Sequence, residues 1–490
     1  MTSLIRYLLR ATIYSIFGAT VVLVIGFVLY LNGRTDLNVW HLAELDQEFT
    51  ADSGVETFAE YLALEDRLFQ QLDELVYAKI QPAQRSAVNR FNRGSLSDPE
   101  RWKPNWNRSF ELTAKSPRAA VLLLHGMSDS PYSLQYLGKR LHAAGANVLG
   151  LRMPGHGTAP SGLVEITWQD MAAAVRLAMR HLAEQNSGRP LYIVGYSTGA
   201  ALAAHYALAA LEDENLPRVE RIALLSPAIG VTSVAALAVW QARLGHLLGL
   251  DKLSWNSILP EYDPFKYGSF AVNAGDVVFQ LTNEIQGRIT AMDEAGRLQG
   301  LPPILAFSSV VDATVSTPAL VDGLFERLPA GGHELILFDI NRMADMEPIL
   351  RSNPAAVLQA LKQDQDRAFT LSIVGNESGR SNAVSVTSKG PGDGAETNIG
   401  LGMSWPRDLY SLAHVALPFP PDDPMYGGQS PRRSPGIQLG NLALRGERGV
   451  LQIPASEMLR LRWNPFYPYV EKRVLELFGL EGHAASGNSP

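Results

Sequence analysis

The sequence contains no cysteine. Without thiols the protein has no disulfide bond, no thiolate zinc site and no cysteine nucleophile, although this leaves its compartment open. Positively charged residues are also fewer than negatively charged ones. The chain has 42 lysines and arginines but 49 aspartates and glutamates, which gives a net charge of −7. This balance gives no electrostatic footprint for nucleic acid, so we expect no such partner. No metal-ligand spacing, glycine-rich phosphate loop or internal repeat is evident, and we expect no cofactor.

Apolar material, by contrast, is abundant. Hydrophobic residues make up 46% of the 490 positions and charged residues only 19%. The chain is longer than one usual domain and has ample material for a buried core. The composition therefore predicts a folded core that carries additional segments.

The first additional segment is the uncharged run Ala11–Leu31. It is long enough for a helix to cross a hydrocarbon core of about 30 Å. Arg6 and Arg10 precede the run, whereas only Arg34 follows it before an acidic stretch. The positive-inside rule therefore makes residues 1–34 a cytoplasmic N-terminus and membrane anchor, with the rest of the chain on the periplasmic or extracellular side. The alternatives are a cleaved signal peptide, although no small-residue cleavage site follows the run, and a buried helix of a soluble protein.

Residues 35–104 form a second segment before the core. Apolar residues recur at helical spacing over 58–76, with acidic and basic residues between them, which predicts an amphipathic helix. Its acidic polar face argues against binding to anionic lipid, so we expect the helix to pack on the rest of the protein. A partner-binding role is the alternative. Residues 92–107, rich in asparagine and broken by proline and glycine, predict a linker into the core.

The most informative motif is Gly195-Tyr196-Ser197-Thr198-Gly199. An apolar strand precedes it and an alanine-rich run follows it, which predicts a sharp turn from a strand into a helix. Such a turn crowds the backbone and strains the central residue, so it needs glycine on both sides. This context predicts that Ser197 is an exposed nucleophile.

A second apolar strand, Ala119–Leu124, ends at His125-Gly126-Met127. Acyl transfer at a serine needs two backbone N–H groups directed at the developing oxyanion. One comes from the residue after the nucleophile and the other from the loop after a neighbouring strand. Thr198 and Met127 fit these two positions.

These motifs resemble the α/β-hydrolases, and among them the serine esterases and lipases of the monoacylglycerol lipase and carboxylesterase type. The resemblance rests on the Leu123–Asp129 strand exit, on Arg152-Met153-Pro154-Gly155-His156-Gly157 and on the serine motif. It covers residues 118–230 strongly and 300–345 moderately. It implies a three-layer α/β sandwich with a mostly parallel sheet over 105–490 and a cap inserted over the site.

The order of predicted elements agrees with that implication, because strands alternate with helices as in a parallel sheet. The predicted strands are 107–112, 119–124, 147–151, 191–194, 221–225, 304–307 and 333–338, and the helices are 133–143, 168–185 and 198–211. In such sheets the chemistry gathers at the carboxyl ends of the strands.

This rule indicates the acid and the base. Asp312 follows the strand 304–307, and the chain order Ser, Asp, His of these hydrolases makes it the orienting carboxylate. Asp339, which ends the next strand, is the competitor. His414 follows the acid and precedes a proline-rich loop, so we expect it to accept the proton of Ser197. Other histidines fall in helices, in the Pro-Gly-His-Gly turn or, for His333, at the opposite end of a strand.

Two insertions depart from the family pattern. Residues 341–411 separate the acid from the histidine, with a helix near 354–363, strands near 369–374 and 383–387, and a loop at 390–398. They either contact substrate or extend the sheet. Residues 231–299 are unusually apolar, which suggests a cap over the site that favours an acyl chain, or a cap that only buries its own small core.

We therefore expect a membrane-anchored serine hydrolase that cleaves carboxylic esters, with lipid-like substrates, through an acyl-enzyme. The same residues would serve acyl transfer to another alcohol or an amine. A non-catalytic binding protein on a hydrolase fold is the third alternative. The sequence does not identify a protein partner.

Overall fold

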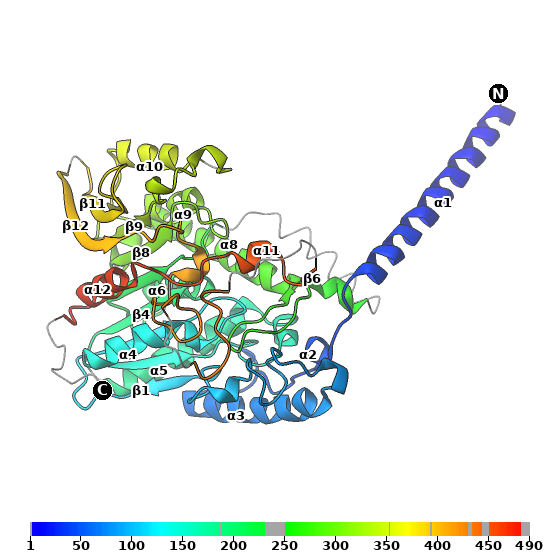
Figure 1. Ribbon diagram of the computed structural model, residues 1–490, viewed down its shortest axis with the longest axis horizontal. Coiled ribbons are helices and arrows are strands. Elements are labelled where there is room, and N and C mark those ends of the chain that lie inside the picture. The colour runs from blue at the N-terminus through cyan, green and yellow to red at the C-terminus, as the bar shows by residue number, and fades with distance from the viewer. Residues whose placement is uncertain are drawn as a thin grey trace.

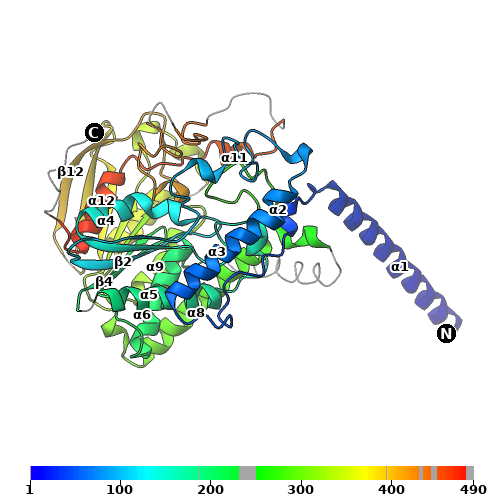
Figure 2. The same cartoon turned by 90° about the horizontal axis from the view of Figure 1, so that it is seen from below.

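The computed structural model describes residues 2–186, 188–230, 250–351, 353–392, 394–429, 434–442 and 450–481. Its longest helix, α1 (Thr2–Gly33), projects from the body, and residues 4–30 of this helix are exposed (Figures 1 and 2). By length and composition, Leu4–Gly33 could cross a membrane, and a signal sequence would meet the same criteria. The rest of the described chain folds around one large sheet.

This sheet has ten strands in the order β1-β3-β2-β4-β5-β8-β9-β10-β11-β12. Strands β2 to β5 and β8 to β10 run parallel, and the two edges, β1 on one side and β11 and β12 on the other, pair antiparallel. The strand bounds are β1 Phe110–Leu112, β2 Ala119–Leu124, β3 Ala146–Leu151, β4 Leu191–Tyr196, β5 Arg221–Leu225, β8 Ile304–Ser309, β9 Glu334–Phe338, β10 Thr370–Asn376, β11 Ala383–Lys389 and β12 Glu396–Ser404. The predicted strands of the core are present, although β1 is shorter than 107–112.

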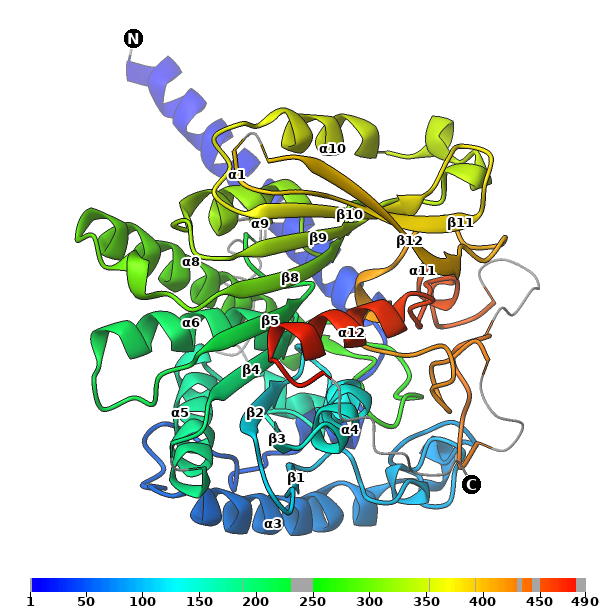
Figure 3. The same ribbon diagram turned by 90° about the vertical axis from the view of Figure 1, so that its left-hand side faces the viewer.

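Helices cover both faces, which makes three layers (Figure 3). Residues of β2 alternate between the two cores, with Leu122 in one and Val121 in the other, because successive side chains of a strand point to opposite faces. One face is covered by α4 (Gln135–Ala143) and α12 (Tyr467–Leu477). The other is covered by α5 (Trp168–Gln185), α6 (Thr198–Glu212), α8 (Val272–Glu294), α9 (Thr317–Gly323) and α10 (Pro354–Gln363). This is the predicted α/β sandwich.

The segment 341–411 extends the sheet, since it supplies α10 and the last three strands. The prediction of a loop over 390–398 is wrong from residue 396 onward, because strand β12 begins at Glu396. Nearly every residue of β12 is exposed, so it has no alternation of buried and exposed positions to mark it as a strand.

The predicted cap, residues 231–299, is described only from residue 250 onward, and its most apolar part lies outside the described residues. The described part contains β6 (Trp255–Ser257), β7 (Phe270–Ala271) and α8. Tyr267 N–H donates to Ser128 O at 2.8 Å, which ties this segment to the loop after β2.

The segment before the core packs on it through α3 (Phe58–Leu75), the predicted amphipathic helix. Beneath this helix a buried Arg152 joins the segment to the core. Its guanidinium donates to both carboxylate oxygens of Glu48, at 2.9 and 3.0 Å, and to Glu65 at 3.1 Å, and it also donates to His156 O at 3.0 Å. The fully buried Arg152 thus fixes the turn at 153–157 against α3.

We expect Arg152→Met to lower the free energy of unfolding by about 3–5 kcal/mol, because it leaves the buried Glu65 carboxylate without its cation. Urea unfolding of the full chain in detergent, followed by tryptophan fluorescence, measures the change. Lys103→Met is the matched control: Lys103 is exposed and its pair with Glu100 should contribute less than about 1 kcal/mol. Equal effects of the two substitutions would contradict a structural role of the buried charges.

Candidate active site

Ser197 occupies the turn between β4 and α6 with φ 54° and ψ −115°, a conformation that non-glycine residues rarely adopt. The turn brings α6 very close to β2. A Cβ atom on Gly199 would lie 2.2 Å from Leu124 O, and one on Gly195 would lie 2.5 Å from the Cα atom of Ala200. Glycine is therefore required at both positions, and the turn holds Ser197 half-exposed at the carboxyl end of the sheet.

The structure brings Ser197, His414 and Asp312 together. His414, at the start of the 3-10 helix η11 (His414–Ala416), has Nε2 3.1 Å from Ser197 Oγ and Nδ1 2.8 Å from Asp312 Oδ2. The facing carboxylate favours the tautomer with a proton on Nδ1, which leaves Nε2 as an acceptor for the serine hydroxyl. A proton can thus move from Ser197 to His414.

Asp312 is held in its charged form. Its Oδ1 accepts the N–H groups of Thr314 and Val315, at 2.8 and 3.0 Å. Burial acts to raise the pKa of Asp312, but the facing His414 ring and the two N–H donors outweigh it, so the pKa lies below its ordinary value. An ionised carboxylate here can orient the ring and stabilise an imidazolium.

Met127 and Thr198 line the cavity onto which Ser197 opens. Thr198 is the first residue of α6, so its N–H lacks an intrahelical partner. The loop that carries Met127 is fixed by His125, whose Nε2 accepts Met153 N–H at 3.1 Å and whose Nδ1 donates to Gly126 O at 2.9 Å. Burial lowers the pKa of His125 well below its ordinary range, which keeps this ring neutral. Both N–H groups thus belong to elements that abut Ser197.

The cavity has a volume of about 530 Å³. Part of its wall is apolar, from Leu259, Phe270, Val278, Val315 and Phe419. Another part is charged and comes from segments far apart in the chain: Asp263, Lys266, Glu457, Arg460 and Arg462. These charged residues were not predicted from the sequence. They belong to no sequence motif, and none of them directly follows a predicted strand.

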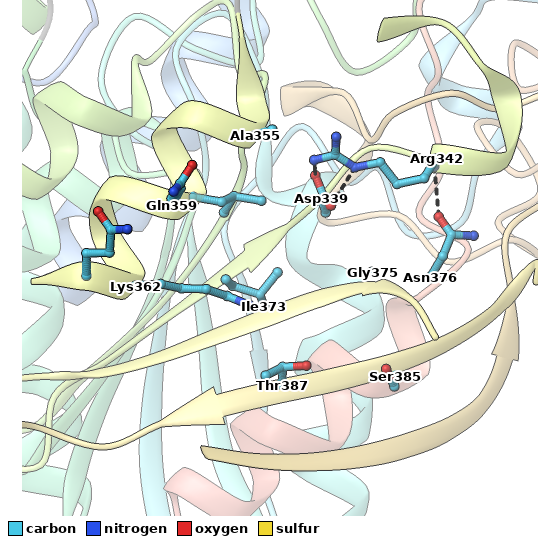
Figure 4. Close-up of a pocket in the computed structure, with 12 residues that line it drawn as sticks. Asp339, Arg342, Ala355, Gln359, Lys362, Ile373, Gly375, Asn376, Ser385 and Thr387 are labelled. Carbon is cyan, nitrogen blue, oxygen red and sulfur yellow. Dashed lines mark hydrogen bonds and ion pairs between the residues drawn. The ribbon is translucent and has the colours of Figure 1, made fainter. Parts of the chain in front are cut away.

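Asp339, the competing acid, lies elsewhere. It lines a second cavity of about 570 Å³ between α10 and strands β10 and β11, where its carboxylate accepts from Arg342 Nη2 at 2.8 Å and Nε at 3.0 Å (Figure 4). His333 lies at the other end of β9, where its Nδ1 accepts Ile304 N–H at 3.2 Å. Neither residue contacts Ser197 in the described structure.

Comparison with known proteins agrees with this fold. Residues 115–273 match the family described as serine aminopeptidase, S33. A thermostable monoacylglycerol lipase from Bacillus sp. (strain H-257) is 27% identical over 123 residues, which are 25% of this chain and 46% of that protein. The chain thus spans about half the length of this curated relative.

Solved structures similar to the chain include lipolytic enzymes. The Paleococcus ferrophilus monoacylglycerol lipase has a TM-score of 0.36 and 20% identity, and the match covers 47% of this chain and 89% of that one. A structure of the metagenome-derived lipolytic enzymes LipS and LipT has the same score and identity, with 53% and 98% covered.

The sheet, its helical layers and the turn at Ser197 define the chain as an α/β-hydrolase. Over residues 115–273 the chain is similar to a serine hydrolase family, and over 123 residues it is similar to a monoacylglycerol lipase.

We expect Gly199→Ala to abolish hydrolysis, because the new methyl group must displace backbone at Leu124 and thereby the turn at Ser197. Hydrolysis of a soluble aryl ester measures the loss. Gly287→Ala in α8 is the control: a Cβ there meets nothing within 4 Å, so the variant should keep its activity and gain about 0.4–1 kcal/mol of stability. An active Gly199→Ala enzyme would contradict the tight approach of α6 to β2.

Proposed function

We propose that the protein hydrolyses carboxylic esters with Ser197 as nucleophile, His414 as base and acid, and Asp312 as the orienting carboxylate. The observation that carries the proposal is the continuous hydrogen-bonded contact from Asp312 through His414 to Ser197 at the wall of the cavity. The relative described as a monoacylglycerol lipase and the apolar part of the cavity favour a substrate with an acyl chain.

In this mechanism Ser197 Oγ attacks the acyl carbon while its proton passes to His414 Nε2. The negative charge that develops on the carbonyl oxygen is bound by the N–H groups of Met127 and Thr198. His414 then gives the proton to the leaving alkoxide, and the acyl group stays on Ser197. Water attacks this ester, its proton passes to His414, and the carboxylic acid leaves as Ser197 takes the proton back.

We expect Ser197→Ala to lower kcat at least about 10⁴-fold and to abolish labelling by a fluorophosphonate, since a single hydroxyl is removed from the attacking position. Ester hydrolysis and probe labelling of the purified full chain measure the two effects. Ser53→Ala, an exposed serine, should be labelled as strongly as wild type. A folded Ser197→Ala enzyme that keeps a tenth of the activity would contradict the assignment.

The same experiment tests the base. His414→Ala should lose nearly as much activity as Ser197→Ala, and the double variant should be little worse than either, because residues that act as one unit are not additive. His333→Ala should lose far less activity. Products formed only when a second alcohol or an amine is supplied would identify an acyltransferase instead.

We also propose that α1 anchors the protein in a membrane with the hydrolase on the non-cytoplasmic side. The chain after α1 is bound to the cap segment: Arg34 donates to the carbonyl oxygens of Lys252 and Trp255 at 2.7 and 2.6 Å, and Lys252 pairs with Asp36 at 2.7 Å. The anchor would thus hold the segment beside the cavity close to the bilayer.

We expect an alkaline phosphatase fused after Pro490 to be active, because this reporter is active only outside the cytoplasm. Arg6 and Arg10 should retain the N-terminus in the cytoplasm and so place the C-terminus on the other side of the membrane. The fusion should stay in the membrane fraction after a high-salt wash. The double variant Arg6→Glu, Arg10→Glu removes the positive charge before α1. It should reduce the fraction of molecules whose C-terminus lies outside the cytoplasm. Recovery of a soluble chain cut near Asn32 would identify a signal peptide instead of an anchor.

A further inference from the structure

Three cationic side chains line the active-site cavity: Lys266, Arg460 and Arg462. We call them the cationic wall. They come from two segments that are far apart in the chain. The backbone beside Lys266 is fixed near the predicted oxyanion loop, since Tyr267 N–H bonds to Ser128 O. Arg460 is fixed near the acid, since its Nη2 donates to Thr314 Oγ1 at 3.0 Å.

The three cations differ in how well they are paired. Arg462 donates to Tyr262 Oη at 2.9 Å and lies 4.0 Å from Asp263, so it is engaged within the protein. In the part of the chain that the structure describes, the short contact of the Arg460 guanidinium is to a neutral hydroxyl, and Glu457 lies 4.0 Å away. Among the described residues Lys266 Nζ forms no hydrogen bond or ion pair, although Asp129 and Asp263 attract its ammonium from beyond contact distance. Lys266 and Arg460 thus retain capacity to bind an anion.

Asp129 and Asp263 oppose this positive charge without a close ion pair to Lys266. Asp263 already accepts two contacts from Tyr426 Oη, at 2.7 and 2.8 Å. Burial raises the pKa of Asp129 to about 7, so this group carries only part of a charge at neutral pH. Burial lowers the pKa of Lys266 and so do Arg460 and Arg462, whereas the carboxylates of Asp129 and Asp263 act to raise it. Like charges around one cavity are stabilised when an anion binds among them.

We propose that Lys266 and Arg460 form an anion subsite, and that the preferred ester carries a phosphate or a carboxylate on the group bound beside this wall. The apolar part of the same cavity would hold the acyl chain, so the substrate is an amphiphilic anionic ester. This inference rests on the proposed function, because the subsite serves the reaction at Ser197. Guanidinium and ammonium groups in a partly desolvated cavity bind such anions strongly.

Three butyrate esters that carry a hydroxyl, a phosphate or a carboxylate at the same end of the molecule test the subsite. The three substrates are 1-butyrylglycerol, 1-butyrylglycerol 3-phosphate and the butyrate ester of glycerate, all soluble as monomers. Wild-type enzyme should hydrolyse at least one anionic ester with a kcat/KM about tenfold or more above that of the neutral ester. Comparison of the two anionic esters distinguishes phosphate from carboxylate.

Lys266→Met should lower the ratio of anionic to neutral kcat/KM about tenfold, with the effect mainly in KM, and Lys266→Arg should restore much of the ratio because it keeps the charge. Lys472→Met, an exposed lysine on α12, is the matched control and should leave the ratio unchanged. If the role of Lys266 were purely structural, Lys266→Met would change kcat/KM for the anionic and the neutral ester by the same factor. The proposal is overturned if wild type shows no preference for either anionic ester or if Lys266→Met leaves the ratio unchanged. Failure of all three esters and of fluorophosphonate labelling would instead refute the proposed function.

Discussion

The close approach of α6 to the end of β2 is the constraint on which the rest of the site depends. Where the backbone of Gly199 meets Leu124 O, no side chain fits between them. The chain can enter the helix only through a strained residue, and Ser197 occupies that position with a positive φ. The same contact sets Gly126 and Met127 beside the serine. Ser197, the proposed nucleophile, and the neighbouring N–H groups are therefore fixed by backbone packing and not by a flexible loop.

The sheet supplies the remaining geometry. Asp312 follows β8, and His414 follows only after the chain has made four further strands, β9 to β12, and returned to the site. The extension by β10, β11 and β12 lengthens the chain between Asp312 and His414, and these strands add at the edge of the sheet beyond β9. An insertion of this size is tolerated since added strands pair with the edge and leave the inner ladder intact.

The charges of the protein are used in two contrasting ways. Arg152 is buried and fully paired with Glu48 and Glu65, so its contribution is to fix the N-terminal segment on the core. Lys266 and Arg460 of the cationic wall line a cavity and have no carboxylate closer than 4.0 Å among the described residues, so we infer that their positive potential is available to a bound molecule. Pairing, more than charge itself, separates a structural cation from one that is free to bind a ligand.

The sequence by itself determined the elements whose signal is local. Apolar runs ending at Gly195 or His125 predicted buried strands and the turn at Ser197, since glycine and hydrophobic periodicity act over a few residues. Chain order further indicated Asp312 and His414, although nothing in the sequence showed their proximity. Strand β12 gave no such signal, because an exposed edge strand has no buried face. The tertiary structure alone decided that 341–411 extends the sheet, that Asp339 pairs with Arg342, and that Lys266 and Arg460 share one cavity. The sheet extension and the shared cavity join residues far apart in the chain, and their energies depend on packing and charge in three dimensions, which local patterns do not encode.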